Sequence, residues 1–233
     1  MKIIIDVMSG DHAPLELLKG AILAANEYRV SIAVVGNRQV IEELAKENDL
    51  SLEDIEIVHA DDVIGMEDKP LAVIREKSNS SMSVGLRMLE NGEGDAYVSA
   101  GNTGALLAGA TLMVRRIKGV RRAAISTVLP FPSPVLLMDA GANLTVTPED
   151  FLQFAYMGSY YMEKMQGIRR PRVGILNNGT EYNKGLPLQV EANALLRQQT
   201  DLNFVGNVEA KELPFGACDI LLTDGFTGNI VLK

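Results

Sequence analysis

One pattern recurs along this chain and constrains its fold more than any other feature. A short apolar run ends in a cluster of Gly, Asn, Asp or Ser, and a segment with helical character follows. The five runs are 3–8, 96–99, 135–138, 173–176 and 220–222, and further strands are predicted at 30–35, 55–58, 123–129 and 203–205. Strands that are apolar throughout and alternate with helices predict a mostly parallel sheet with helices on both faces.

The predicted helices complete a three-layer, Rossmann-like α/β fold. They lie at 14–27, 38–48, 81–90, 105–116, 148–166 and 188–199. Thr147 is a suitable N-cap for the fifth helix, because Pro148 follows it at the first helical position. We expect a single α/β domain over residues 1–233, with a division into two lobes as the alternative.

Composition and missing motifs exclude several classes of protein. The net charge of −8 argues against a nucleic-acid partner, which needs a basic surface. Cys218 is the only cysteine, so no internal disulfide forms and a reducing, cytoplasmic location is expected. No apolar run approaches the roughly 20 residues that cross a bilayer. The two common nucleotide-binding fingerprints are missing, so we expect no cofactor. No Cys/His cluster is present, so we expect no metal.

The polar clusters predict where a ligand binds. Right-handed crossovers place the carboxyl ends of parallel strands at one edge of the sheet, where ligands bind in folds of this kind. We therefore expect the five clusters to meet in one crevice. The segment 101–104, Gly-Asn-Thr-Gly, opens a helix directly after a strand, and free backbone N–H groups there can bind phosphate. A tight turn capped by Asn102 explains the same residues equally well.

Two further side chains are candidates for catalysis. Asn229 follows a strand at the start of a helix and can hold an oxyanion, although a capping asparagine fits the same spacing. Lys184 lies in a polar loop and can bind phosphate, stabilise an oxyanion or transfer a proton; a solvated loop lysine is the commoner case. Glu181 can orient Lys184 by charge pairing. Asp139 and Asn143 can hold phosphate-bound water, but such pairs more often form turns.

Two basic clusters have alternative explanations. They are Arg115, Arg116, Lys118, Arg121 and Arg122, and Arg169, Arg170 and Arg172. Solvated charge at a helix end is the commoner explanation, and a docking surface for an acidic partner is the alternative.

At these loops the sequence resembles the phosphate acyltransferase family of bacterial phospholipid synthesis, the PlsX type. The resemblance is carried by residues 5–14, 99–105, 139–143, 206–209 and 224–229, in order along the whole chain. Ser9 and Ala140 stand where the family often has Gly and Val, and His12 stands where Asn is common. Together these motifs are specific, whereas each alone is weak.

The resemblance implies a fold like that of the isocitrate and isopropylmalate dehydrogenases. It implies a reversible transfer of a fatty acyl group from acyl carrier protein to inorganic phosphate, with a membrane glycerol-3-phosphate acyltransferase using the product. It also implies a homodimer that is cytoplasmic or in peripheral contact with the inner face of the membrane. Family members continue past the position of Lys233, so the chain is expected to lack their C-terminal segment.

The resemblance also implies which residues act. The active-site Lys and Asn of the family match Lys184 and Asn229. The residues expected to bind phosphate or substrate are Asp6, Gly101, Asn102, Thr103, Gly104, Asp139, Asn143, Asn177, Gly179, Glu181, Asp224 and Gly225. Two rival functions stay open at this point: a dehydrogenase acting on a hydroxy acid, suggested by the fold alone, and a non-catalytic scaffold that docks carrier protein.

Overall fold

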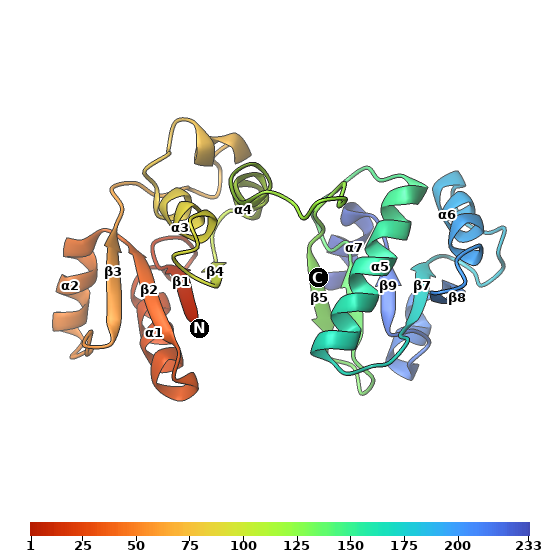
Figure 1. Cartoon of the computed structure of the whole chain (residues 1–233), viewed down its shortest axis with the longest axis horizontal. Coiled ribbons are helices and arrows are strands. Elements are labelled where there is room, and N and C mark those ends of the chain that lie inside the picture. Colours follow the sequence, from red (N-terminus) through yellow and green to blue (C-terminus); the bar gives the residue numbers. More distant parts are fainter. The chain divides into compact units, whose positions relative to one another are not determined.

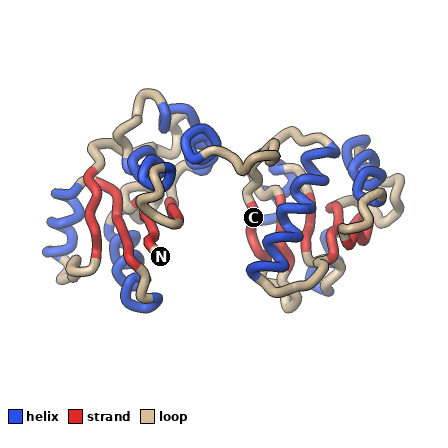
Figure 2. Tube along the Cα trace, in the orientation of Figure 1, coloured by secondary structure: helices blue, strands red, loops and turns tan.

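The chain forms two compact units, each with its own sheet. A computed structural model describes residues 1–233, and contacts divide them into Met1–Ile117 and Lys118–Lys233. In both units helices flank a mainly parallel sheet (Figure 1), and strands alternate with helices along the chain (Figure 2). The predicted α/β class is confirmed, but the strands make two sheets instead of one. That the units are two lobes of one domain stays a prediction.

The first unit contains four parallel strands in the order β3-β2-β1-β4. They are β1 (Lys2–Asp6), β2 (Ser31–Gly36), β3 (Ile55–His59) and β4 (Ala96–Ser99). β2 is buried from Ile32 to Val35, as a strand covered on both faces must be. The carboxyl ends of β1 and β4 are neighbours, so the loops that follow them lie together.

Helices cover both faces of the first sheet. They are α1 (Leu15–Tyr28), α2 (Arg38–Glu47), α3 (Ser81–Glu90), α4 (Thr103–Gly109), the 3₁₀ helix η1 (Pro70–Ile74) and the π-helical turn η2 (Ala110–Val114). Leu18 and Ile41 pack with Val7 in one cluster, and Met88 packs with Ile4 in another. The helix predicted at 105–116 is therefore α4 followed by a π-helical turn.

The second unit contains five strands in the order β5-β6-β9-β7-β8. They are β5 (Ser126–Leu129), β6 (Val135–Met138), β7 (Arg172–Leu176), β8 (Asn203–Val208) and β9 (Ile220–Leu222). Only β5 is antiparallel to its neighbour. β9 is last in sequence but central in the sheet, so the loops after β6 and β7 lie on either side of the helix that follows β9.

The helices of the second unit are α5 (Pro148–Met165), α6 (Pro187–Arg197), α7 (Gly225–Leu232) and the 3₁₀ helix η3 (Ala210–Phe215). α5 begins as predicted, because Thr147 and Asp150 form a reciprocal capping box. Phe151 and Phe154 on α5 are fully buried against the sheet. The apolar face of this helix is therefore largely core.

An ion pair closes the amino end of the second sheet. Arg172 donates to both carboxylate oxygens of Asp219, at 3.1 and 2.7 Å, and to the carbonyl of Gly216. Burial opposes ionisation of Asp219, but the hydrogen bonds from Arg172 outweigh burial and lower the pKa of the carboxyl. Arg172 therefore has a structural role, and its charge does not contribute to the basic cluster predicted with Arg169 and Arg170.

Replacing this carboxylate should lower stability in a pH-dependent way. We expect Asp219→Asn to cost about 2 kcal/mol at neutral pH, because Arg172 would lose its charged partner. A carboxyl whose pKa is lower in the folded than in the unfolded state stabilises the protein above the unfolded pKa of about 4. This stabilisation is lost as the pH falls through the pKa of the folded state. Urea unfolding at several pH values should therefore show the two proteins converging in acid. A gap that stays constant down to pH ~2 would contradict this prediction.

Candidate active site

Asp6 joins the two loops at the carboxyl edge of the first sheet. Its buried carboxylate accepts hydrogen bonds from the backbone N–H of Met8 at 3.1 Å and from the hydroxyls of Ser99 and Tyr97 at 3.0 and 3.4 Å. Burial raises the pKa of Tyr97 well above its usual value, and the charge of Asp6 adds to the shift. Asp6 thus ties the end of β1 to β4.

Two glycines allow the loops after β1 and β4 to touch. A Cβ on Gly101 would lie 2.6 Å from Cβ of Ser9, too close for any other residue type without movement. Gly10 has a φ of +128° and faces Ala100. Two of the five predicted clusters are therefore in direct contact within this unit.

Asn102 uses its side chain inside the protein. Its Oδ1 caps α4 by accepting from the N–H of Ala105 at 3.0 Å, and its Nδ2 faces the carbonyls of Gly65, Met66 and Asp68 at 3.0–3.2 Å. The capped-turn explanation of 101–104 therefore describes Asn102. Thr103 is exposed and Gly104 half-buried, so the first turn of α4 faces outward. Phosphate binding there stays a prediction.

Asp139 organises the loop that follows β6 in the second unit. Its carboxylate accepts five hydrogen bonds, from the backbone N–H groups of Ile125, Gly141, Ala142 and Asn143 and from the Asn143 side chain, at 2.7–3.1 Å. Asn143 Nδ2 also donates to the carbonyl of Ala123 at 2.7 Å. Both side chains shape the loop, as the turn-forming explanation predicts, and their binding role stays a prediction.

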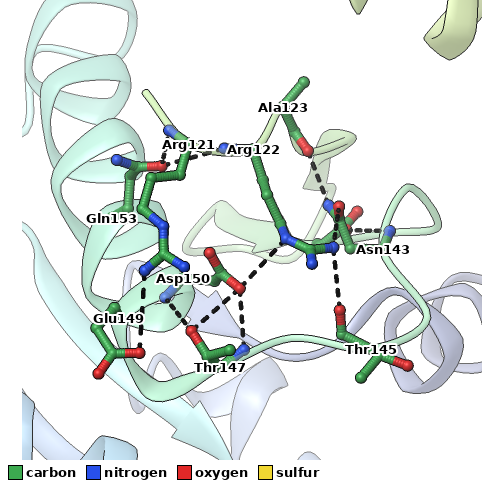
Figure 3. Close-up of polar contacts among 10 residues, drawn as sticks. Arg121, Arg122, Ala123, Asn143, Thr145, Thr147, Glu149, Asp150 and Gln153 are labelled. Atoms are coloured by element: carbon green, nitrogen blue, oxygen red, sulfur yellow. Dashed lines mark hydrogen bonds and ion pairs between the residues drawn. The ribbon is translucent and has the colours of Figure 1, made fainter. Parts of the chain in front are cut away.

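Arg122 braces this loop against the start of α5 (Figure 3). Its Nη1 donates to Asn143 Oδ1 at 3.3 Å and to the carbonyl of Thr145 at 3.2 Å. Its Nε lies 3.4 Å from a carboxylate oxygen of the buried Asp150. The backbone N–H groups of Arg121 and Arg122 donate to Gln153. The Nη1 of Arg121 also lies 4.0 Å from a carboxylate oxygen of Glu149, so the charges of both arginines face acidic side chains of α5 and do not form a free basic surface. Arg115, Arg116 and Lys118 remain exposed and without ion pairs.

α7 lies directly on the Asp139 loop. Asp224 caps α7 by accepting from the N–H and hydroxyl of Thr227, and the N–H of Gly225 donates to the carbonyl of Asn143 at 2.8 Å. Asn229 Nδ2 lies 3.4 Å from the carbonyl of Ala140. The clusters that begin at Asp139 and Asp224 are therefore brought together, with the half-buried Asn229 between them.

The loop after β7 carries Lys184 on a short turn. The N–H of Lys184 donates to the carbonyl of Glu181 at 3.1 Å, and Asn177 Nδ2 donates to the carbonyl of Lys184 at 2.9 Å. The side chain of Lys184 is exposed, with neither a hydrogen bond nor an ion pair, so the suggested pairing with Glu181 is not formed. Gly179 lies beside both side chains: a Cβ there would be 2.9 Å from Glu181 Oε2.

A pocket of about 430 Å³ opens between this loop and α7. It is lined by Leu176, Asn177, Asn178, Gly185, Leu186, Gln189 and Thr227. Its size and mixed lining suit a small-molecule arm. The buried Oε1 of Gln189 has no hydrogen-bond partner. Sequence patterns did not identify Gln189, which belongs to no recognisable motif, and Thr227 was not selected as a site residue although it lies within the motif 224–229.

The structure gives little support for metal-dependent chemistry or for a cysteine nucleophile. No group of three or more His, Cys, Asp or Glu side chains is placed to bind a metal ion. Cys218 is fully buried, and burial raises the pKa of its thiol to about 12, so it is not a nucleophile at neutral pH. None of the helices has both the length and the apolar character needed to traverse a bilayer.

Comparisons with known proteins agree along the whole chain. Residues 1–233 match the family described as "Fatty acid synthesis protein". The phosphate acyltransferase of Alkaliphilus oremlandii is 45% identical over 234 residues, which cover 100% of this chain and 70% of the relative. That of Caldicellulosiruptor bescii is 46% identical over 235 residues, with the same coverage.

Solved structures with similar folds are more distant in sequence. The EutD phosphotransacetylase from Staphylococcus aureus has a TM-score of 0.71 at 19% identity, over 100% of this chain and 80% of that one. A 4-hydroxythreonine-4-phosphate dehydrogenase from Burkholderia phymatum has a TM-score of 0.55 at 17% identity, over 95% and 79%. At such identities the likeness shows the fold alone, and it confirms the predicted fold class.

Proposed function

This chain belongs to the fatty acid synthesis protein family and is a phosphate acyltransferase, and from that premise we propose its reaction. A fatty acyl group passes from the thioester of acyl carrier protein to inorganic phosphate. A phosphate oxygen attacks the thioester carbonyl, the C–O bond forms, the C–S bond breaks and the thiolate leaves. Thioester and acyl phosphate are both activated acyl groups, so the reaction runs in either direction.

The observation that carries the site is the pocket between the Lys184 loop and α7. Neither Lys184 nor Asn229 lines this pocket, but the elements that line it carry both residues: the loop carries the unpaired ammonium of Lys184, and α7 carries the Asn229 amide, which faces the Asp139 loop. Both groups can stabilise the negative charge that develops on phosphate or carbonyl oxygen in the transition state. We propose that Lys184 and Asn229 supply this stabilisation, and that the reaction needs no enzyme nucleophile.

Phosphate binding is proposed for the loops that the sequence singled out. These are Asp6 with residues 101–104 in the first unit, and the loops at Asp139 and Asp224 in the second. The carboxylates support these loops from within, so backbone N–H groups are the better candidates for direct anion contact. A structure with bound phosphate would test this: an anion held away from all of these loops would contradict it.

Direct detection of acyl phosphate tests the reaction. The protein is mixed with fatty acyl carrier protein and inorganic phosphate, and acyl phosphate is followed by mass spectrometry. We expect acyl phosphate only when phosphate is present, and free carrier protein in equal amount. Release of free fatty acid without acyl phosphate would show a hydrolase, and carrier-protein binding without turnover would favour the scaffold. Absence of nicotinamide binding would dismiss the dehydrogenase.

We propose that the acidic partner expected at the remaining basic residues is acyl carrier protein. Arg115 and Arg116 are exposed and make no ion pair, so their charge is available to a partner. Arg115→Glu with Arg116→Glu should raise KM for acyl carrier protein about tenfold at low salt and leave kcat unchanged. Lys46→Glu on α2, also exposed and unpaired, is the control. An unaltered KM, or an effect that persists at high ionic strength, would argue against docking there.

Three further properties are proposals from the family resemblance. We propose that the protein is a homodimer, which sedimentation would test, and that its product passes to a membrane glycerol-3-phosphate acyltransferase. Peripheral contact with the membrane is proposed on the same basis, with vesicle flotation as its test.

A further inference from the structure

A chain of polar side chains runs from the exposed Arg197 through two buried asparagines to the turn that carries Lys184. Arg197 Nε donates to Asn193 Oδ1 at 2.7 Å, and Asn193 Nδ2 donates to Asn207 Oδ1 at 2.9 Å. Asn207 Nδ2 then donates to the carbonyl of Glu181 at 2.6 Å. Asn193 and Asn207 are only 1% and 6% exposed, so these two asparagines lie inside the second unit between α6 and the end of β8.

Burial of two amides in this position is costly unless each is satisfied. An unpaired buried amide costs about 1–3 kcal/mol, whereas apolar residues of similar volume would pack without that risk. Both amides are paired here, and the last donor faces a loop instead of the core. Asn207 therefore joins α6, through Asn193, to the turn at Glu181, and packing of α6 on the sheet does not by itself explain the second of these contacts.

The turn at 181–184 has little else to hold it. Residues 180–187 are all exposed, so apolar burial contributes little to its position. Its carbonyls are held at two points: Asn207 binds that of Glu181, and Asn177 binds that of Lys184. The N–H of Lys184 closes the turn onto the same Glu181 carbonyl that Asn207 binds.

We propose that Asn207 is a positioning residue, which fixes the turn 181–184 and through it the ammonium of Lys184. The expected effect of Asn207 on turnover rests on the proposed function, whereas its effect on the order of the turn does not. Asn207 sits at the carboxyl end of β8, next to β7 in the sheet, so the strand order brings its amide to the loop that follows β7.

The ordering of the turn can be measured without activity. Asn207→Ala removes the donor, and Asn207→Asp keeps the shape and the acceptor for Asn193 but places an oxygen against the Glu181 carbonyl. Hydrogen exchange of residues 178–186 should rise at least tenfold in both variants. The matched control is Asn203→Ala on the same strand, whose Nδ2 donates to the carbonyl of Arg170 at 3.0 Å, far along the strand from the turn.

Turnover supplies the second readout. A misplacement of about 1 Å in a reacting group can cost 10²-fold, so kcat of Asn207→Ala should fall about 10²-fold and KM should change much less. Asn203→Ala should retain its kcat. In a Lys184→Ala background, Asn207→Ala should cause no further loss, because its effect passes through Lys184.

Two results would overturn the proposal. One is unchanged exchange at 178–186 in a folded Asn207→Ala protein; the other is a full additional loss of kcat in the double variant. If Asn207→Ala does not fold, Asn177→Ala provides a second variant, because it removes the other hydrogen bond to a carbonyl of the turn. Unchanged hydrogen exchange of residues 178–186 in that variant would show that these side-chain contacts do not hold the turn. Full activity of Lys184→Ala would refute the role of Lys184 in the reaction but leave the exchange result standing.

Discussion

Lys184→Ala should lower the rate of acyl phosphate formation by about 10²–10³-fold, the loss typical of removing one group that stabilises a developing oxyanion. The side chain is exposed and makes no hydrogen bond or ion pair, so its removal should leave stability unchanged. A loss of turnover without a loss of stability therefore separates a chemical role from a structural one. Direct measurement of acyl phosphate in both directions gives kcat and KM.

Lys211→Ala is the matched control for this prediction. Lys211 lies in the same unit, 74% exposed, and pairs only with Glu209. We expect this variant to keep full activity. Normal turnover by Lys184→Ala would remove Lys184 from the mechanism, and an equal fall in both variants would point to a general effect of charge. Lys184→Arg, which keeps the charge but changes its shape, should recover only part of the rate.

Gly228→Ala should destabilise the second unit by about 3 kcal/mol or more, as overpacking does where the backbone cannot move. A Cβ on Gly228 would fall on the carbonyl oxygen of Asp139, far inside the 3.0 Å limit of real Cβ contacts. That carbonyl belongs to the loop held by five hydrogen bonds to Asp139, so the helix must move instead. α7 would then be displaced from the Asp139 loop, and Asn229 would move with it.

Thermal unfolding and hydrogen exchange of residues 224–232 would measure this effect. The control is Gly20→Ala in α1, where a Cβ would have no neighbour within 4 Å. Removing a glycine from a helix interior should stabilise the protein by about 0.5–1 kcal/mol. A Gly228→Ala protein with native stability and native exchange in α7 would show that the loop yields, contrary to this account.

Much of the secondary structure could be predicted because its causes are local. Apolar runs marked the strands, and Thr147 followed by Pro148 marked the start of α5. A helix start was expected after the strand at 220–222, but the sequence analysis did not identify Asp224 as the N-cap of α7. The helix expected at 105–116 was less accurate, since its second half is a π-helical turn whose hydrogen bonds no residue pattern announces.

The partners of polar side chains could not be predicted in the same way. Asn102 was selected for a ligand, yet its amide binds carbonyls of residues 65–68. Arg122 was grouped with solvated or docking charges, yet it joins Asn143 to Asp150. These contacts join residues distant in the sequence, and an arginine or asparagine gives no local sign of which distant group it will meet.

The sequence by itself determined which segments are strands and helices, which loop follows each strand, and to which family the chain belongs. These follow from apolar periodicity, capping residues and motifs, all of which act over a few neighbouring residues. Only the tertiary structure decided which loops meet. Because β9 lies between β6 and β7, α7 rests on the Asp139 loop and also borders the pocket beside the loop that carries Lys184. Because β8 pairs with β7, Asn207 reaches the turn of Lys184. Strand order depends on the burial of whole faces, which no short stretch of residues encodes.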